Sequence, residues 1–66
     1  MGTEIELGSV VMDPLTNCNG TVVRTVRIGG WARVCVQPSE LKDGRPVEEV
    51  WFDETRVELV RGPVLD

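Results

Sequence analysis

The chain has 66 residues, of which 41% are hydrophobic, and a formal net charge of −4. This length allows one domain with a small core, and an acidic surface disfavours contact with phosphate backbones or anionic lipid. The sequence has no histidine, and Cys18 and Cys35 lie too far apart for the usual paired ligands of a metal site. We therefore expect neither a metal nor another cofactor.

The amino-terminal residues and the two cysteines bear on cellular location. The segment MGTEIEL has neither the basic region nor the apolar region of a signal peptide, and no apolar run approaches membrane length. These features favour a cytoplasmic protein with reduced thiols and no membrane contact. A disulfide between Cys18 and Cys35 is the alternative.

The chain is expected to begin with a lead-in over residues 1–8, followed by a short strand over 9–12. Alternation along that strand would turn Val10 and Met12 towards the core and Val11 away from it. The Asp-Pro pair that follows ends the strand, because proline cannot donate to a ladder and restricts the residue before it.

A β-hairpin over residues 20–38 organises the rest of the chain. Two runs rich in β-branched residues flank Gly29 and Gly30, a pair that suits the positive φ of a primed two-residue turn. Val22 and Val23 are adjacent, so they cannot both face the core of a regular strand. We therefore expect a bulge or a sharp bend in the first arm.

The longest polar connection covers residues 38–46 and is bounded by prolines. Asp43 and Gly44 mark a tight turn inside it, and Leu41 is expected to fold back over one end of the core. A fourth strand is predicted over 47–52, where the sequence again becomes rich in β-branched and aromatic residues.

The last part of the chain contains a short turn, a strand and a tail. Residues 53–55 are predicted to form a single helical or 3₁₀ turn, with the Asp53 side chain accepting a backbone N–H as a cap. A fifth strand over 56–60 alternates cleanly, and residues 61–66 form a tail that we expect to fray. The folded domain therefore covers 9–60.

Five short strands, a long third loop and one 3₁₀ turn before the last strand predict an all-β protein. The architecture they favour is a small five-stranded antiparallel barrel of the SH3-like, or Tudor-like, class. The side chains predicted to fill its core are those of Val34, Val36, Val50, Phe52, Val57 and Leu59. The same alternation leaves four side chains pointing away from the core: Trp31, Arg33, Cys35 and Trp51.

Several segments resemble a family of short proteins from phages, prophages and mobile integron gene cassettes. These are ELGSVVMD, TNCNGTVV, VCVQP, LKDGRPVEEVWFDE and TRVELV, which together span about residues 6–60. The chain departs from the family pattern at 17–19, where TGF-x is usual, and at 29–31, where an aromatic residue and L-N-G are common. The family has no established activity, so the resemblance implies a small SH3-like barrel of mobile-element origin.

A looser similarity, in fold class alone, is to the plasmid-type dihydrofolate reductases, which are small SH3-like cassette proteins that act as tetramers. Their V-Q-I-Y active-site signature is absent, and Val36-Gln37-Pro38 stands in its place. We therefore do not expect a reductase.

Two tryptophans on the outside of so small a sheet favour a contact surface, because large exposed apolar patches usually mark one. The alternative is ordinary packing of partly buried tryptophans. Our hypothesis is a non-enzymatic interaction module that self-associates, as a dimer or a tetramer. The interface would contain Trp31, Arg33, Cys35 and Trp51, and a host or phage protein is a further candidate partner.

The hairpin is the only basic segment, which leaves nucleic-acid binding as the alternative function. Its contacts would be Arg24, Arg27, Arg33 and Trp31, since basic residues beside an aromatic ring suit a stacking platform. The competing interpretation is that these arginines pair with acidic residues of neighbouring strands. The acidic candidates are Glu48, Glu49 and Glu58.

No pattern of catalytic residues stands out. Asp53 and Glu54 are adjacent carboxylates beside a predicted turn, where capping explains them better than acid–base chemistry. Cys35 would need a neighbouring base to act as a nucleophile, and its expected neighbours Trp31 and Arg33 supply none. We therefore expect an inert thiol and a protein that is not an enzyme.

Overall fold

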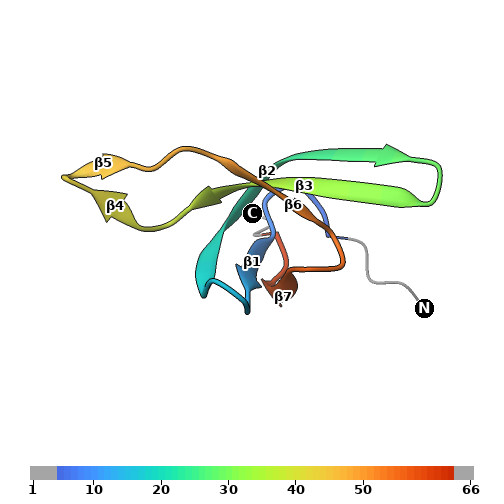
Figure 1. The fold of residues 1–66 in the computed structure, drawn as a ribbon, viewed down its shortest axis with the longest axis horizontal. Coiled ribbons are helices and arrows are strands. Elements are labelled where there is room, and N and C mark those ends of the chain that lie inside the picture. Colours follow the sequence, from blue (N-terminus) through green and yellow to red (C-terminus); the bar gives the residue numbers. More distant parts are fainter. Residues whose placement is uncertain (1–4, 64–66) are drawn as a thin grey trace.

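The structure, a computed structural model, describes residues 5–63 and contains an antiparallel sheet of five strands in the order β6-β3-β2-β1-β7 (Figure 1). The strands are β1 (Val10–Asp13), β2 (Cys18–Ile28), β3 (Trp31–Pro38), β6 (Val50–Asp53) and β7 (Glu58–Arg61). A separate two-stranded ribbon joins β4 (Leu41–Lys42) to β5 (Arg45–Pro46). The all-β prediction is confirmed. The edge strands β6 and β7 do not pair with each other, so the sheet is not closed.

The β2–β3 hairpin turns at Gly29 and Gly30, as the sequence predicts. Ile28 lies opposite Trp31 across the turn, and Gly29 takes a φ of 61°. A positive φ at the first central residue is the signature of a type II′ turn, whose twist matches the strands on either side. The hairpin continues past the core as a long arm (Figure 1).

The predicted irregularity in β2 is a bulge between Val22 and Arg24, where the pairing with β3 shifts. The bulge has a consequence that alternation does not reveal. Val22 lies opposite Val36 in the core, whereas Thr25, three positions later, lies opposite the buried Val34. Because of the extra residue, the alternation of side chains in β2 is reversed after the bulge. Even-numbered residues face the core before the bulge, as Val22 does, and face away from the core after it, as Val26 does.

A second arm, formed by β4 and β5, extends from the opposite end of the molecule (Figure 1). Asp43 and Gly44 have φ values of 55° and 76°, so both central residues are left-handed, as a type I′ turn requires. The predicted tight turn is therefore confirmed. The expectation that Leu41 covers the core is wrong, because its side chain lies on this arm and is exposed.

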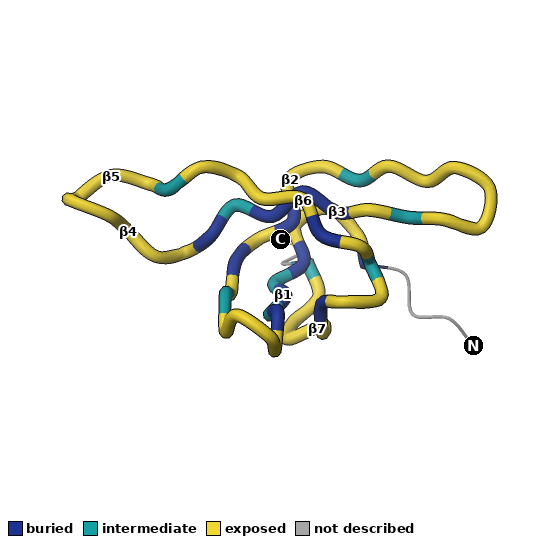
Figure 2. Tube along the Cα trace, viewed as in Figure 1, coloured by how far each residue is buried: buried dark blue, intermediate teal, exposed yellow. Residues whose placement is uncertain are grey.

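The core lies beneath the middle of the sheet, where the buried segments of β1, β2, β3 and β6 meet (Figure 2). Its buried hydrophobic cluster comprises Ile5, Val11, Val22, Val34, Val36, Phe52 and Val57. The predicted burial of Val34, Val36, Phe52 and Val57 is confirmed. Ile5, which belongs to the predicted lead-in, packs into the same cluster.

Two predicted core residues lie at the edges of the open sheet. Val50, on β6, is 40% exposed, and Leu59, on β7, is 46% exposed. Each lies opposite a buried valine of the neighbouring strand, Val36 for Val50 and Val11 for Leu59. Both therefore face the core side, and they stay exposed because no strand pairs beyond them.

The predicted facing of β1 is reversed. Val11 is buried, while Val10 and Met12 are only partly buried. Val11 lies opposite Gly20, where the close approach of Val36 and Gln37 leaves no space for a side chain. Val10, Val11 and Met12 are all apolar, so the sequence has no alternation that shows which of them face the core.

The last two strands start later than predicted, at Val50 and Glu58, and a turn joins them. The Asp53 carbonyl accepts from the Arg56 N–H at 2.9 Å, and the Asp53 Oδ1 accepts from the Thr55 N–H at 3.1 Å. The predicted cap is confirmed, although the turn does not extend into a 3₁₀ helix. Parts of the predicted lead-in and tail, 1–4 and 64–66, lie outside the described residues.

Candidate interaction face

We call the surface of β2, β3 and β6 that points away from the core the outer face. Strand pairing places its side chains in cross-strand rows, because residues opposite each other in an antiparallel sheet share a face. Arg24, Cys35 and Trp51 form one row. Val26, Arg33 and Asp53 form the next, and Ile28 lies opposite Trp31 in the third.

The two tryptophans are exposed, as predicted, and they border a hollow of about 230 Å³. Trp31 is 42% exposed and Trp51 is 44% exposed, while Val26 and Arg33 complete the lining of the hollow. Ile28, at 65% exposure, adds a further apolar side chain next to Trp31. The bulge in β2 brings Val26 and Ile28 to this face, so that three strands contribute apolar side chains to it.

Arg33 occupies the centre of the outer face. Its guanidinium carbon lies 4.9 Å from the centre of the Trp31 ring, which is a cation–π distance. Asp53 lies opposite Arg33 on β6. The pKa of Asp53 is lowered first by its hydrogen bonds from Thr55 and further by the charge of Arg33. The positive charge of Arg33 thus lies close to a negative charge of the same chain.

Cys35 belongs to the outer face by pairing, but the expectation that it points into solvent is wrong. Its side chain is fully buried, between Arg24 and Trp51 of the same row. The thiol donates to the Glu49 Oε1 at 3.6 Å, and burial, together with the charge of Glu49, raises the pKa of the thiol. Cys18 is likewise a free thiol, so the two cysteines form no disulfide. A neutral buried thiol is a poor nucleophile.

The arginines of the basic hairpin are engaged within the chain. Arg24 lies 3.9 Å from Glu49, one of the three acidic partners that the sequence suggested. Arg27 instead pairs with Glu54 at 2.7 Å and donates to the carbonyl of Ile5 at 3.1 Å. The sequence alone did not predict Glu54 as the partner of Arg27. The two side chains meet only because the turn after β6 folds back towards β2.

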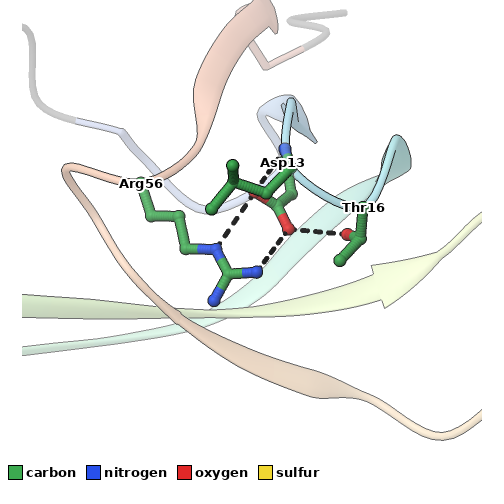
Figure 3. A network of polar contacts seen from close by, with 4 residues as sticks. Asp13, Thr16 and Arg56 are labelled. Atoms are coloured by element: carbon green, nitrogen blue, oxygen red, sulfur yellow. Dashed lines mark hydrogen bonds and ion pairs between the residues drawn. The ribbon is translucent and has the colours of Figure 1, made fainter.

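A second polar cluster, at the other end of the core, was missed entirely (Figure 3). Arg56 donates two hydrogen bonds to the fully buried carboxylate of Asp13, and the Thr16 hydroxyl donates a third at 2.6 Å. Asp13 had been assigned only to the end of a strand. Arg56 also lies over the Phe52 ring, 5.4 Å from its centre. The cluster joins segments that are distant in sequence, and the hydrogen bonds of the Asp13 carboxylate are made within the chain, so we assign it a structural role.

Metal sites, membrane-spanning segments and known relatives also bear on function. Across residues 5–63, no group of three or more acidic or cysteine side chains is placed to hold a metal ion. This same part of the chain has no helix long and apolar enough to span a membrane. Comparison with protein-family models, with curated proteins and with solved structures found no match. The outer face is therefore the strongest candidate for a functional surface.

Proposed function

We propose that this protein is a non-enzymatic interaction module that self-associates through the outer face of its sheet. The observation that carries the proposal is the grouping of Trp31, Trp51 and Val26 around a shallow hollow, with Ile28 beside them opposite Trp31. These four side chains come from three adjacent strands and are all exposed. Aromatic side chains are enriched at the centres of protein interfaces, where they supply much of the binding energy.

A second copy of the chain is the occupant that we favour. A two-fold contact places the same patch on both subunits, so one apolar face serves both halves of the interface. The core of so small a domain has room for one set of apolar side chains, and this chain supplies a second set on the outside. The charges of the face lie near groups of opposite sign within the chain, with Arg33 opposite Asp53 and Arg24 lying 3.9 Å from Glu49, so apposition of two copies brings no excess of one sign to its centre.

The test is the mass in solution, measured by sedimentation or light scattering over a concentration series. Trp51→Ala should shift the molecule towards monomer and cost on the order of 2 kcal/mol of association free energy. Trp31→Ala should act in the same direction. The matched control is Leu15→Ala, an exposed apolar residue in the β1–β2 turn, which should leave the mass distribution unchanged. A wild type that stays monomeric at hundreds of micromolar would end the proposal.

We infer, as part of the same proposal, that the fold is an open relative of the SH3-like, or Tudor-like, barrel. The support is the meander from β1 to β3 and on to β6, with β7 returning to β1, and the bulged β2 in its middle. A mobile-element origin rests on the sequence resemblance. A host or phage protein remains a further candidate partner of the same face.

The alternative function is nucleic-acid binding through Arg24, Arg27, Arg33 and Trp31. The observation in its favour is that Trp31 is exposed with Arg33 beside its ring, an arrangement on which a base could stack. Two observations weigh against it. Arg27 is held by Glu54, and the whole chain is acidic.

A further inference from the structure

The open edge of β6 differs from the open edge of β7 in the features that keep sheet edges from pairing. Natural edge strands are protected by bulges, charges or proline. In β7, pairing with β1 shifts between Leu59 and Arg61, which leaves Val60 as a bulge, and Pro63 follows the strand. The four residues of β6, VWFD, pair with β3 without a shift and contain neither lysine nor proline.

The hydrogen bonding of β6 identifies the groups at its free edge. The Glu54 N–H donates to the Ala32 carbonyl at 3.0 Å, directly after the strand. Because antiparallel pairs alternate between bonded and non-bonded positions, the backbone groups of Phe52 and Val50 also point towards β3. Those of Trp51 therefore point outwards, as does the Asp53 N–H. The Asp53 carbonyl already accepts from Arg56.

We propose that a second copy of the chain pairs antiparallel along this edge, with the two-fold axis at Trp51. This rests on the proposed self-association and gives it a specific contact, the free edge of β6, which adjoins the outer face. In such a pair, a residue of one β6 strand and the residue opposite it in the other β6 strand lie on the same face of the sheet. The allowed registers are therefore those in which the outer faces of the two copies form one continuous face. The register centred on Trp51 uses its free N–H and C=O twice, once from each copy. The result is one continuous sheet with both Trp51 side chains adjacent on the outer face.

The same register explains the exposed apolar side chain on the other face of β6. Val50 faces the core side at 40% exposure and would lie opposite the second copy's Phe52. The pairing therefore covers Val50 and extends the core across the two-fold axis. The burial of apolar area at both faces of β6 adds to the backbone hydrogen bonds, as in other cases of strand addition.

Electrostatics is compatible with this register because an arginine lies beside each of the two acidic groups that it brings together. Glu49, just before β6, would lie near the second copy's Asp53, and like charges directly opposite are unfavourable. Arg24 lies 3.9 Å from Glu49, and Arg33 lies opposite Asp53 within each chain. The two-fold axis thus places Glu49 of one copy and Asp53 of the other between Arg24 and the second copy's Arg33.

Backbone amide hydrogen exchange, followed by NMR over a dilution series of the wild type, tests the proposal. The Trp51 amide should exchange on the order of tenfold more slowly in the oligomer than in the dilute monomer. The amides of Val50 and Phe52, which point to β3, serve as internal controls and should stay protected at all concentrations. Sedimentation under the same conditions reports the mass.

Each outcome decides a different point. A protein that never self-associates overturns both the proposed function and the edge pairing. An oligomer whose Trp51 amide exchanges as fast as in the monomer overturns the edge pairing and leaves self-association through the face intact. A concentration-dependent protection of Trp51 supports self-association along the β6 edge.

A pair of lysine substitutions gives an independent test. Val50→Lys places a charge at the β6 edge and should weaken association on the order of tenfold or more, as edge lysines do in natural sheets. Val60→Lys places the same charge on the bulged β7 edge and should leave association unchanged. Equal effects of the two variants would overturn the proposal. Circular dichroism of each variant establishes that it is folded, and the wild-type exchange experiment stands without either.

Discussion

Asp13 and Arg56 are 43 positions apart in the chain, yet their side chains form two parallel hydrogen bonds. Arg56 Nε lies 3.1 Å from Oδ1 of Asp13, and Nη2 lies 2.9 Å from Oδ2. The carboxylate is fully buried and also accepts from Thr16 (Figure 3). The pair ties the end of β1 to the turn that precedes β7. It therefore fixes the two segments whose pairing forms one edge of the sheet.

This buried pair makes the stability of the fold depend on pH. The bonds from Arg56 and then from Thr16 lower the pKa of Asp13 to about 2. An aspartate in an unfolded chain titrates near pH ~3.9. The pair's contribution is therefore fully present above about pH 4 and is lost as the pH falls towards 2, because the unfolded chain takes up the proton first. Urea denaturation from pH 6 to pH 2, followed by tryptophan fluorescence, should show this loss.

Asp13→Asn identifies the source of the pH dependence. The variant should be less stable than the wild type at neutral pH and should lose less stability on acidification. Asp43→Asn, on the exposed β4–β5 turn, is the matched control and should follow the wild-type curve. Parallel pH profiles for the wild type and Asp13→Asn would show that another group is responsible.

The Asp13–Arg56 pair also shows where sequence reasoning stops. Turn residues and β-branched runs located the five main strands, because they depend on neighbours a few positions apart. A contact between β1 and the turn after β6 depends on the whole topology. An aspartate before proline at a strand end gave no sign that its carboxylate would be buried and paired.

The facing of side chains could be predicted only where alternation was clear. It correctly turned Trp31 and Trp51 outwards and Val34 inwards. It failed for Cys35, which points to the outer face but is covered there, because alternation gives the direction of a side chain and not its burial. The prediction that Val50 and Leu59 are buried failed for a different reason. Both side chains point to the core side, but they lie on the edge strands β6 and β7 and are therefore exposed.

Gly20 is the position where an added methyl group would do the most damage. A Cβ there would lie 2.3 Å from the Gln37 carbonyl oxygen and 2.7 Å from Cγ1 of Val36. The first of these is a backbone atom of the paired strand β3, so the strands would have to separate. We expect Gly20→Ala to lower the free energy of unfolding by about 2 kcal/mol or more, measured by chemical denaturation.

Gly30→Ala is the control for Gly20→Ala. Nothing lies within 4 Å of a Cβ at Gly30, and its φ is not in the left-handed region. Its effect should stay below about 1 kcal/mol, with a gain in stability as plausible as a loss, since alanine restricts the unfolded chain. Equal losses for the two variants would mean that the close approach of β2 and β3 at Gly20 is not what the glycine provides.

The basic hairpin should not bind nucleic acid at physiological salt. Glu54 holds Arg27, Arg33 lies over Trp31 and opposite Asp53, and the net charge of the chain opposes approach to phosphates. Fluorescence anisotropy with labelled duplex and single-stranded oligonucleotides should therefore show no saturable binding. The contrary result would be micromolar binding that weakens with salt at a logarithmic slope of about −2.7, the value for three phosphate contacts on duplex DNA. Loss of that binding in the double variant Arg24→Glu, Arg33→Glu would then assign the hairpin, and not the apolar outer face, as the functional surface.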